Sequence, residues 1–185
     1  MKEEKSLYFI AVVPPEPERE ELLLLKKIFS EEYDTKAALR SPPHITLHMP
    51  FRFRRDREES LSLTLEKFFS QFSTFTVCLK GFGAFPPRVI YADVEENEFL
   101  QILQSELKVI MKTAFNIFNA DYKERPFRPH MTLAFRDLKK PMFLKAWNKY
   151  REENIEMCWE VTHIALLRHT GKKWEILKEM ELKSV

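Results

Sequence analysis

Apolar residues recur along the chain with two different periods, and these periods predict helices and strands. Segments with an apolar residue at every third or fourth position are expected to be helices, the last with a proline in its first turn: Glu16–Tyr33, Glu58–Phe72, Asn97–Phe118 and Pro141–Tyr150. Short runs rich in β-branched and aromatic residues are expected to be strands: Leu7–Val13, His44–Met49, Thr74–Lys80, Arg88–Val94, His130–Phe135, Ile155–Val161, His163–His169 and Lys173–Leu182. We expect Gly81-Phe82-Gly83 to end the third of these strands and Thr170-Gly171 to form the turn of a terminal hairpin.

The apolar content predicts one compact unit over residues 1–185. Hydrophobic residues make up 44% of the 185 positions and include 16 Phe, so a sizeable core can form, and no linker interrupts the pattern. The net charge is only +2, so any contact with nucleic acid should be local. Leu7–Val13 stops at Pro14-Pro15, and no run approaches the ~18 apolar residues of a membrane span. We expect a cytoplasmic monomer without a membrane partner.

The two cysteines, Cys78 and Cys158, each lie in a predicted strand and are far apart in the sequence. In a reducing cytoplasm such cysteines are expected to be free, buried thiols. A single disulfide bond between them is the alternative.

A five-residue pattern, Pro-His-x-Thr-Leu, occurs twice, at 43–47 and at 129–133. In both places it follows a predicted strand and a long predicted helix, so the two halves of the chain repeat one unit. The chain has only five histidines, and two of them, His44 and His130, belong to this pattern. Because chance seldom produces such a matched pair, it indicates a duplicated unit that carries chemistry.

Each motif places a histidine and a threonine on the same face of a strand. Side chains at i and i+2 project to one face about 6.6 Å apart. His44 therefore accompanies Thr46, and His130 accompanies Thr132. The residues between and after them are apolar and face the other side: Ile45, Leu47, Met131 and Leu133. If the two units pair about a pseudo-two-fold axis, two imidazoles and two hydroxyls converge in one groove.

This constellation suits phosphodiester chemistry without a metal ion. Two histidines with an ordinary pKa of about 6.5 can share one proton near neutral pH. One then acts as general base on a nucleophile, and the other acts as general acid on a leaving oxygen. The two threonine hydroxyls can bind the free oxygens of a phosphate held between them.

Arginines and aromatic residues near the motifs are candidate substrate-binding residues. Arg88 and Arg128 are candidate ligands of a substrate phosphate, and Arg40 is a weaker one. Phe85 can stack on a base or fill the core. The run Arg52–Arg57 contains four arginines and is expected to be a loop, either simply solvated or gathering a phosphate backbone at the mouth of the groove.

Three further residues follow the first motif closely. Phe51 and Phe53 alternate with arginines; core packing is expected for both, and base stacking is the alternative, with Arg52 as a candidate substrate-binding residue beside them. His48 is expected on the face of the motif side chains, where it lines the groove or packs at its edge. It lies ~13 Å along the strand from the motif histidine, too far to share one zinc ion with it. The remaining histidines, His163 and His169, are expected to be structural or solvated.

The paired motifs resemble those of the 2H phosphoesterase superfamily, which includes 2′,5′ RNA ligase-like proteins and 2′,3′-cyclic phosphodiesterases. The opening strand, the Gly-Phe-Gly-x-Phe-Pro segment at 81–86 and the terminal hairpin are also similar to that family. The resemblance implies an α+β fold of two similar lobes, with antiparallel sheets flanking a central cleft and helices outside. It implies that His44 and His130 are catalytic, that Thr46 and Thr132 bind phosphate, and that no metal or other cofactor takes part.

The predicted function is a metal-independent phosphoesterase that acts on 2′,3′-cyclic phosphate ends of nucleotides or RNA. The same site with a 5′-hydroxyl in place of water would be a 2′,5′ RNA ligase. A third possibility is a module that binds RNA ends without turnover, although both motifs are intact. Glycine-rich nucleotide-binding motifs are absent, which excludes Rossmann and P-loop sites. The near-identical motifs do not tell which histidine is the acid and which is the base.

Overall fold

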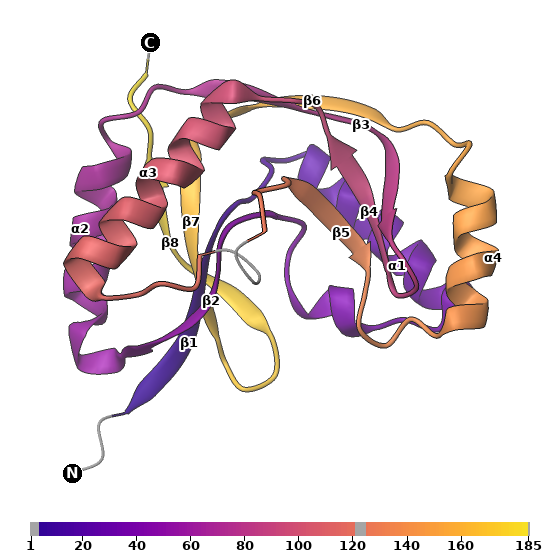
Figure 1. The fold of residues 1–185 in the computed structure, drawn as a ribbon, viewed down its shortest axis with the longest axis horizontal. Coiled ribbons are helices and arrows are strands. Elements are labelled where there is room, and N and C mark those ends of the chain that lie inside the picture. The colour runs from indigo at the N-terminus through magenta and orange to yellow at the C-terminus, as the bar shows by residue number, and fades with distance from the viewer. Residues whose placement is uncertain (1–3, 121–124, 185) are drawn as a thin grey trace.

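Residues 4–120 and 125–184 are described by a computed structural model in which eight strands form one antiparallel sheet (Figure 1). The strands are β1 (Lys5–Val12), β2 (Ile45–Arg54), β3 (Phe75–Phe85), β4 (Val89–Val94), β5 (His130–Ala134), β6 (Glu156–Val161), β7 (His163–His169) and β8 (Trp174–Glu181). The helices are α1 (Glu18–Tyr33), α2 (Glu58–Phe69), α3 (Glu98–Phe115) and α4 (Lys140–Tyr150), with short 3₁₀ turns at Ala37–Arg40 and Arg55–Arg57. The predicted α+β class is confirmed. No helix in these two ranges is long and apolar enough to cross a bilayer.

The sheet consists of two four-stranded halves that share a single residue pair, Ile45 of β2 and Met131 of β5. One half contains β6, β3, β4 and β5 and is covered by α1 and α4; the other contains β2, β1, β7 and β8 and is covered by α2 and α3 (Figure 1). Each repeat unit contributes to both halves, because α1 follows β1 but packs on β5, whereas α3 follows β4 but packs on β2. The two similar lobes expected from the sequence are present, and their exchanged helices hold them together.

The helices pack on the sheet through stripes of buried apolar side chains at helical spacing. In α3 the stripe is fully buried: Leu100, Leu103, Leu107 and Met111. The first turn of α3 is capped by Asn97, whose side chain accepts a hydrogen bond of 2.9 Å from the backbone N–H of Leu100. The helix ends before the predicted Phe118, because Asn116 adopts a left-handed conformation with φ of 56°. Likewise, α2 ends at Phe69, short of the predicted Phe72.

The predicted break at Gly81-Phe82-Gly83 is wrong, because β3 continues through it to Phe85. Gly81 adopts φ of 69°, and β3 gains one residue relative to β4 between its paired residues Leu79 and Phe82. A glycine with positive φ in such a β-bulge bends a strand without ending it. At this bend β3 passes from pairing with β6 to pairing with β4.

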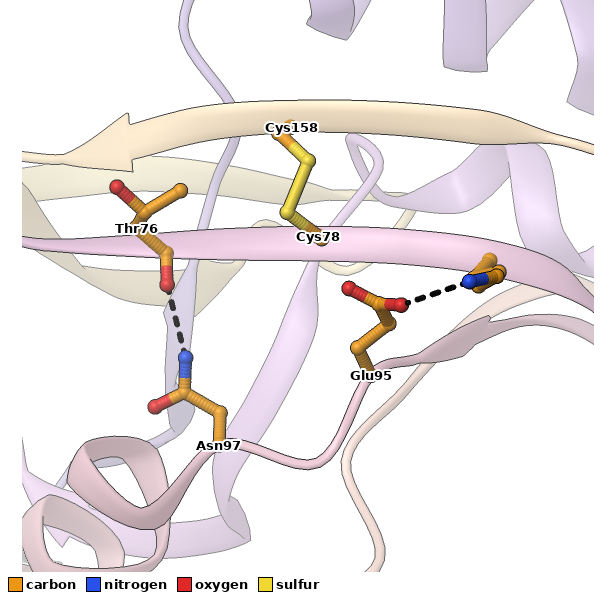
Figure 2. Close-up of a disulfide and its surroundings, with 6 residues drawn as sticks. Thr76, Cys78, Glu95, Asn97 and Cys158 are labelled. Carbon is orange, nitrogen blue, oxygen red and sulfur yellow. Dashed lines mark hydrogen bonds and ion pairs between the residues drawn. A yellow bond between two sulfur atoms is a disulfide. The ribbon is translucent and has the colours of Figure 1, made fainter.

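Cys78 and Cys158 form a disulfide bond, so the prediction of free, buried thiols is wrong (Figure 2). The two residues are 80 positions apart in sequence but directly opposed on β3 and β6, with Cα atoms 4.1 Å apart. Opposed side chains on antiparallel strands leave the sheet on the same face, which brings the two sulfurs together. Cys158 is exposed, so the bond lies on the solvent side of the sheet. Disulfides are unusual in a reducing cytoplasm, and the cytoplasmic location stays a prediction.

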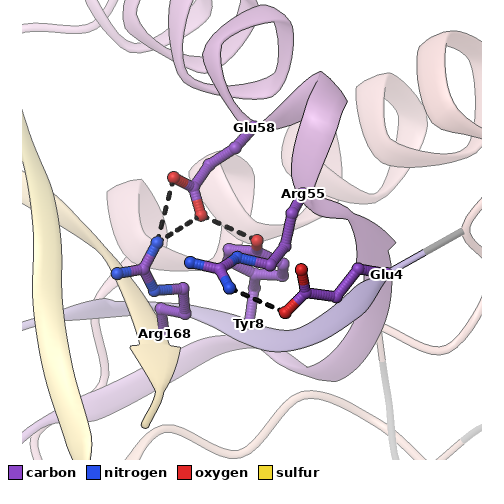
Figure 3. Close-up of polar contacts among 5 residues, drawn as sticks. All are labelled: Glu4, Tyr8, Arg55, Glu58 and Arg168. Carbon is purple, nitrogen blue, oxygen red and sulfur yellow. Dashed lines mark hydrogen bonds and ion pairs between the residues drawn. The ribbon is translucent and has the colours of Figure 1, made fainter.

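The start of α2 is fastened to the sheet by one carboxylate (Figure 3). Arg168 of β7 donates hydrogen bonds of 2.9 and 3.1 Å to the two oxygens of Glu58. The hydroxyl of Tyr8 on β1 donates to the same carboxylate at 2.7 Å. Burial, assisted by this carboxylate, raises the pKa of Tyr8 to about 12. Tyr8 belongs to the core beneath the helices, so this network is structural.

Candidate active site

The two motif histidines meet where the halves of the sheet join. His44 directly precedes β2, and His130 is the first residue of β5; these are the strands whose single shared pair joins the halves. Extending that antiparallel register by one residue in each direction sets Thr46 opposite His130 and His44 opposite Thr132. Opposed side chains in a sheet have Cβ atoms about 5 Å apart. The two motifs therefore lie side by side.

The four motif side chains project from the face of the sheet that the helices leave uncovered, which we call the open face. Each of them is partly exposed: His44, Thr46, His130 and Thr132. The apolar residues that alternate with them are at most 1% exposed and lie in the core beneath the helices: Ile45, Leu47, Met131 and Leu133. The predicted separation of the motifs into a polar face and an apolar face is confirmed.

Both imidazoles are held in the same orientation by the backbone. Nδ1 of His44 lies 2.8 Å from the carbonyl oxygen of Pro42, and Nδ1 of His130 lies 2.7 Å from that of Arg128. Because a carbonyl oxygen can only accept, each Nδ1 donates its proton. In the neutral ring Nε2 then carries a lone pair, and this atom is the one available to exchange protons with a substrate.

The surroundings of both rings favour the neutral imidazole. Burial is the largest cause and lowers the pKa of His44 to about 4, and the charge of Lys26 acts in the same direction. Burial also lowers the pKa of His130; the charge of Arg128 adds to this effect, whereas Asp93 opposes it. A negatively charged phosphate bound beside the rings would favour their protonated forms.

An aromatic and cationic cluster surrounds His130. Its ring centroid lies 5.0 Å from that of Tyr91 and 5.1 Å from that of Phe85. The guanidinium of Arg128 lies over both aromatic rings, 5.5 Å from the centroid of Phe85 and 5.6 Å from that of Tyr91. Gly83 provides the space for the Tyr91 ring, because any Cβ at this position would clash with it. Phe85 is 36% exposed, so its ring can still take a further stacking partner.

A series of ring contacts leads away from His44 across the other half of the sheet. The His44 ring lies 4.8 Å from that of Phe9, which lies 4.7 Å from that of Trp174. Trp174 in turn contacts the ring of His169 at 4.9 Å, centroid to centroid. These residues lie with a small apolar cluster on the open face: Phe9, Ala11, Ala165 and Leu167, flanked by Val13, Trp174 and Ile176. His169 therefore packs against Trp174, which is the structural one of the two roles expected for it.

His48 does not lie on the open face, so the expectation that it shares the face of the motif side chains is wrong. Ile10 of β1 pairs with His48 of β2, and the next residue of β1, Ala11, pairs with Thr46. β2 therefore carries one extra residue at this point. This irregularity interrupts the alternation of side chains. His48 is 0% exposed and packs edge-on against Phe51, which is itself a core residue. The core role expected for Phe51 is confirmed.

The segment Arg52–Arg57 is not the predicted loop, because β2 continues to Arg54 and a 3₁₀ turn follows. Two of its arginines take part in ion pairs. Arg54 pairs with Asp56, and Arg55 donates to the carboxylate of Glu4 at 2.7 Å (Figure 3). These two arginines are therefore engaged within the protein.

The other candidate arginines are all exposed and differ in what they contact. Arg128 is exposed and belongs to the cluster around His130. Arg52 is exposed on β2, and Arg88 is exposed on the turn between β3 and β4. Arg40 is exposed at the end of the first 3₁₀ turn. Of these, only Arg128 has a described contact with the aromatic residues that surround a motif histidine.

The residues around the motif histidines that were not predicted include Lys26, Phe9 and Tyr91, and Trp174, which reaches His44 through Phe9. The repeat gives no signal for Tyr91, because Tyr91 pairs with Thr132 as Ala11 pairs with Thr46, so its counterpart in the first unit is an alanine. The sequence alone gave no signal for Lys26 or Trp174 either. Within the two described ranges, no three His, Cys, Asp or Glu side chains are grouped as metal ligands would be.

Comparison with known proteins identifies relatives across most of the chain. The model of a family described as the 2′-5′ RNA ligase superfamily matches residues 13–173. A candidate phosphoesterase of Geobacillus sp. (strain WCH70) is 29% identical over 141 residues, which are 75% of this chain and 76% of that protein. A candidate phosphoesterase of Bacillus cereus (strain AH820) is 34% identical over 105 residues, so the match spans 56% of either chain.

Solved structures share the fold over nearly the whole chain. TT0787 of Thermus thermophilus superposes with a TM-score of 0.68 at 22% identity, covering 96% of this chain and 98% of that one. LigT of Escherichia coli complexed with 3′-AMP gives a TM-score of 0.69 at 20% identity, covering 97% and 99%. Other crystal structures of E. coli LigT contain NADP+, ATP or phosphate. At these identities the similarity establishes a common fold.

Proposed function

The chain belongs to the 2′-5′ RNA ligase superfamily, and we propose that it is a phosphoesterase that opens 2′,3′-cyclic phosphates at nucleotide or RNA ends. The proposed catalysis uses two histidines and no metal ion. One observation carries it: two partly exposed imidazoles, each with Nδ1 bonded to a backbone carbonyl, lie beside each other's threonine on one open face. Two Nε2 atoms are thus available to give and take protons on either side of one phosphate.

The reaction follows from these four side chains. The hydroxyls of Thr46 and Thr132 bind the two non-bridging oxygens of the phosphate. One histidine takes a proton from water through Nε2 while the water oxygen bonds to phosphorus. The bond between phosphorus and one ribose oxygen breaks, and the other histidine protonates that oxygen through Nε2. The product is a ribose monophosphate, and transfer of one proton between the histidines restores the starting state.

Nucleotide binding is supported by the aromatic surfaces beside each histidine. Phe85 with Arg128 lies on one side, and Trp174 with Phe9 lies on the other. Bases stack on aromatic rings with about 1–3 kcal/mol each, without a strong sequence preference. The presence of 3′-AMP in the E. coli LigT structure of the same fold agrees with a nucleotide substrate.

Hydrolysis of nucleoside 2′,3′-cyclic phosphates and of short RNAs with a cyclic phosphate end, measured with EDTA present, tests the proposal. We expect turnover by the wild type and a loss of at least 100-fold in His44→Ala and in His130→Ala, because general acid and base each contribute about 10²–10⁴-fold. His163→Ala is the matched control, since this exposed histidine lies outside the site. It should keep full activity.

The other outcomes separate the alternatives. If turnover needs an added divalent metal, the two-histidine mechanism is wrong. If no cyclic phosphate is hydrolysed but RNA ends are joined when a 5′-hydroxyl RNA is supplied, the protein is a 2′,5′ RNA ligase. If it binds RNA ends and neither reaction occurs, it is a binding module.

A further inference from the structure

Helices α1 and α3, one from each repeat unit, bury side chains at matching positions. One of these positions holds a basic residue in α1 and a neutral one in α3. Among their buried side chains, α1 and α3 each present four with the spacing i, i+4, i+7 and i+11: Leu22, Lys26, Phe29 and Tyr33 in α1, and Leu100, Gln104, Leu107 and Met111 in α3. Lys26 and Gln104 occupy the same place in these stripes, and they are 2% and 3% exposed. A basic amine therefore lies in the core of the first unit where the second has an amide that does not titrate.

Each helix also holds the segment in front of a motif histidine. Lys26 Nζ donates a hydrogen bond of 2.7 Å to the carbonyl of Ser41, three residues before the first motif histidine. Gln101 Nε2 donates at 3.4 Å to the carbonyl of Phe127, three residues before the second. In both units the next carbonyl along the chain accepts the Nδ1–H of the histidine. The two supports hold corresponding carbonyls with different donors: the buried amine of Lys26 in the first unit, and in the second the exposed amide of Gln101, one helical turn before Gln104.

The charged groups around the two imidazoles also differ between the two units. His44 is acted on by Lys26 from α1 and by His130 across the junction of β2 and β5. His130 is acted on by the adjacent Arg128 and by Asp93, its partner in the ladder of β4 and β5. Among the described groups that act on the two imidazoles, the one carboxylate is that of Asp93, beside His130. Burial lowers the pKa of Lys26 to about 7, so Lys26 is charged throughout the acid range in which His44 titrates.

Building on the function proposed above, we propose that Lys26 is a positioning residue that holds the segment before His44 and keeps the shared proton on His130. His44 is then the general base and His130 the general acid. Water gives a proton to Nε2 of His44 as its oxygen bonds to phosphorus. The departing ribose oxygen takes its proton from Nε2 of His130. Lys26 touches no reacting atom in this scheme and acts only through His44.

Histidine titration by NMR in the ligand-free protein tests this role without relying on activity. In the wild type we expect His44 to titrate at lower pH than His130. In Lys26→Gln, which introduces the amide found in the other unit, the midpoint of His44 should rise by about half a pH unit or more. The midpoint of His130 should stay unchanged. Lys27→Gln is the matched control, because Lys27 is the exposed neighbour on the same helix and its loss should move neither midpoint.

If Lys26 variants do not fold, a variant that adds a positive charge to the second unit provides a second test. Gln101 is exposed, so Gln101→Lys should be tolerated and should lower the midpoint of His130. The proposal is overturned if His130 titrates below His44 in the wild type, if Lys26→Gln leaves His44 unmoved, or if Gln101→Lys leaves His130 unmoved. A protein that shows the predicted midpoints but hydrolyses no cyclic phosphate would refute the proposed function and leave the electrostatic effect of Lys26 intact. A protein that hydrolyses cyclic phosphates but lacks those midpoints would support the proposed function and refute the role of Lys26.

Discussion

Gly83 lies directly against the ring of Tyr91. A Cβ atom at position 83 would sit 2.6 Å from the Tyr91 hydroxyl oxygen and closer still to two ring carbons. The two residues are paired on β3 and β4, so this close approach belongs to the sheet itself. Tyr91 in turn packs against His130, at 5.0 Å between ring centroids. The absence of a side chain at position 83 therefore allows the aromatic support of a motif histidine.

We predict that Gly83→Ala displaces the Tyr91 ring and disturbs His130. The variant should lose about 1–3 kcal/mol of stability, as overpacked sites do. Its kcat/KM on a cyclic phosphate should fall at least tenfold. Urea unfolding and steady-state kinetics measure the two effects.

A second substitution provides the control for this prediction. Tyr91→Leu removes the clashing ring atoms, so Gly83→Ala should destabilise the Tyr91→Leu protein far less than the wild type. Equal losses of stability in both backgrounds would contradict the proposed clash.

The motif positions could be predicted because they depend on local alternation alone. His44 with Thr46 and His130 with Thr132 lie two residues apart on strands that start regularly, so the period of two gives their faces correctly. His48 was misplaced because β2 carries an extra residue opposite β1. Such a bulge depends on the partner strand, and the local sequence does not contain it.

Lys26 and the cysteines were misjudged for a related reason. Helical spacing puts the apolar residues Leu22, Leu25, Ile28 and Phe29 on one face of the first helix, but the buried stripe also includes Lys26. A lysine is almost never fully buried without a partner, and this partner is the carbonyl of Ser41, which lies outside the helix. The disulfide likewise depends on the register of β3 with β6. The burial of Lys26 and the disulfide bond therefore depend on contacts between segments far apart in the sequence, which local periodicity does not reveal.

We predict that Trp174→Ala weakens substrate binding. If Trp174 stacks on a nucleobase, its removal should raise KM about tenfold while kcat changes little, since stacking contributes about 1–3 kcal/mol. Steady-state kinetics on nucleoside cyclic phosphates measure both constants. Phe118→Ala is the control, because Phe118 is 64% exposed and contacts Lys112 outside the site. A loss confined to kcat would argue against base stacking.

We predict that the disulfide supports stability and leaves activity unchanged. Reduction, or Cys78→Ser, should lower the free energy of unfolding by about 2–4 kcal/mol, because the bond closes a long loop. The bond joins β3 to β6, the edge strand of the sheet, whereas the motifs lie at the junction of β2 and β5. Urea unfolding and kinetics with and without reductant measure both properties. A reductant should have no further effect on Cys78→Ser, and identical wild-type curves would contradict the prediction.

We predict that Lys26 makes stability rise with pH above neutrality. Its pKa is about 7 in the folded protein, against 10.5 ordinarily, so between these values only the unfolded chain holds the proton. Stability therefore increases with pH in this window, and the full penalty of burying the charge applies below it. Relative to Lys26→Met, wild-type stability should improve by about 2–4 kcal/mol between pH 7 and pH 10. Parallel curves for the two proteins would show that Lys26 titrates normally.

We predict a bell-shaped pH profile of kcat/KM that lies on the acid side of 6.5, the ordinary pKa of histidine. The profile of kcat/KM reports the free enzyme, in which burial lowers the pKa of both His44 and His130. The rate should rise as His44 loses its proton, near pH 4, and fall as His130 loses the proton it must donate. In the profile of kcat both limbs should move to higher pH, because a bound phosphate stabilises the imidazolium forms. A kcat/KM profile still rising above pH 7.5 would mean that these two histidines are not the acid and the base.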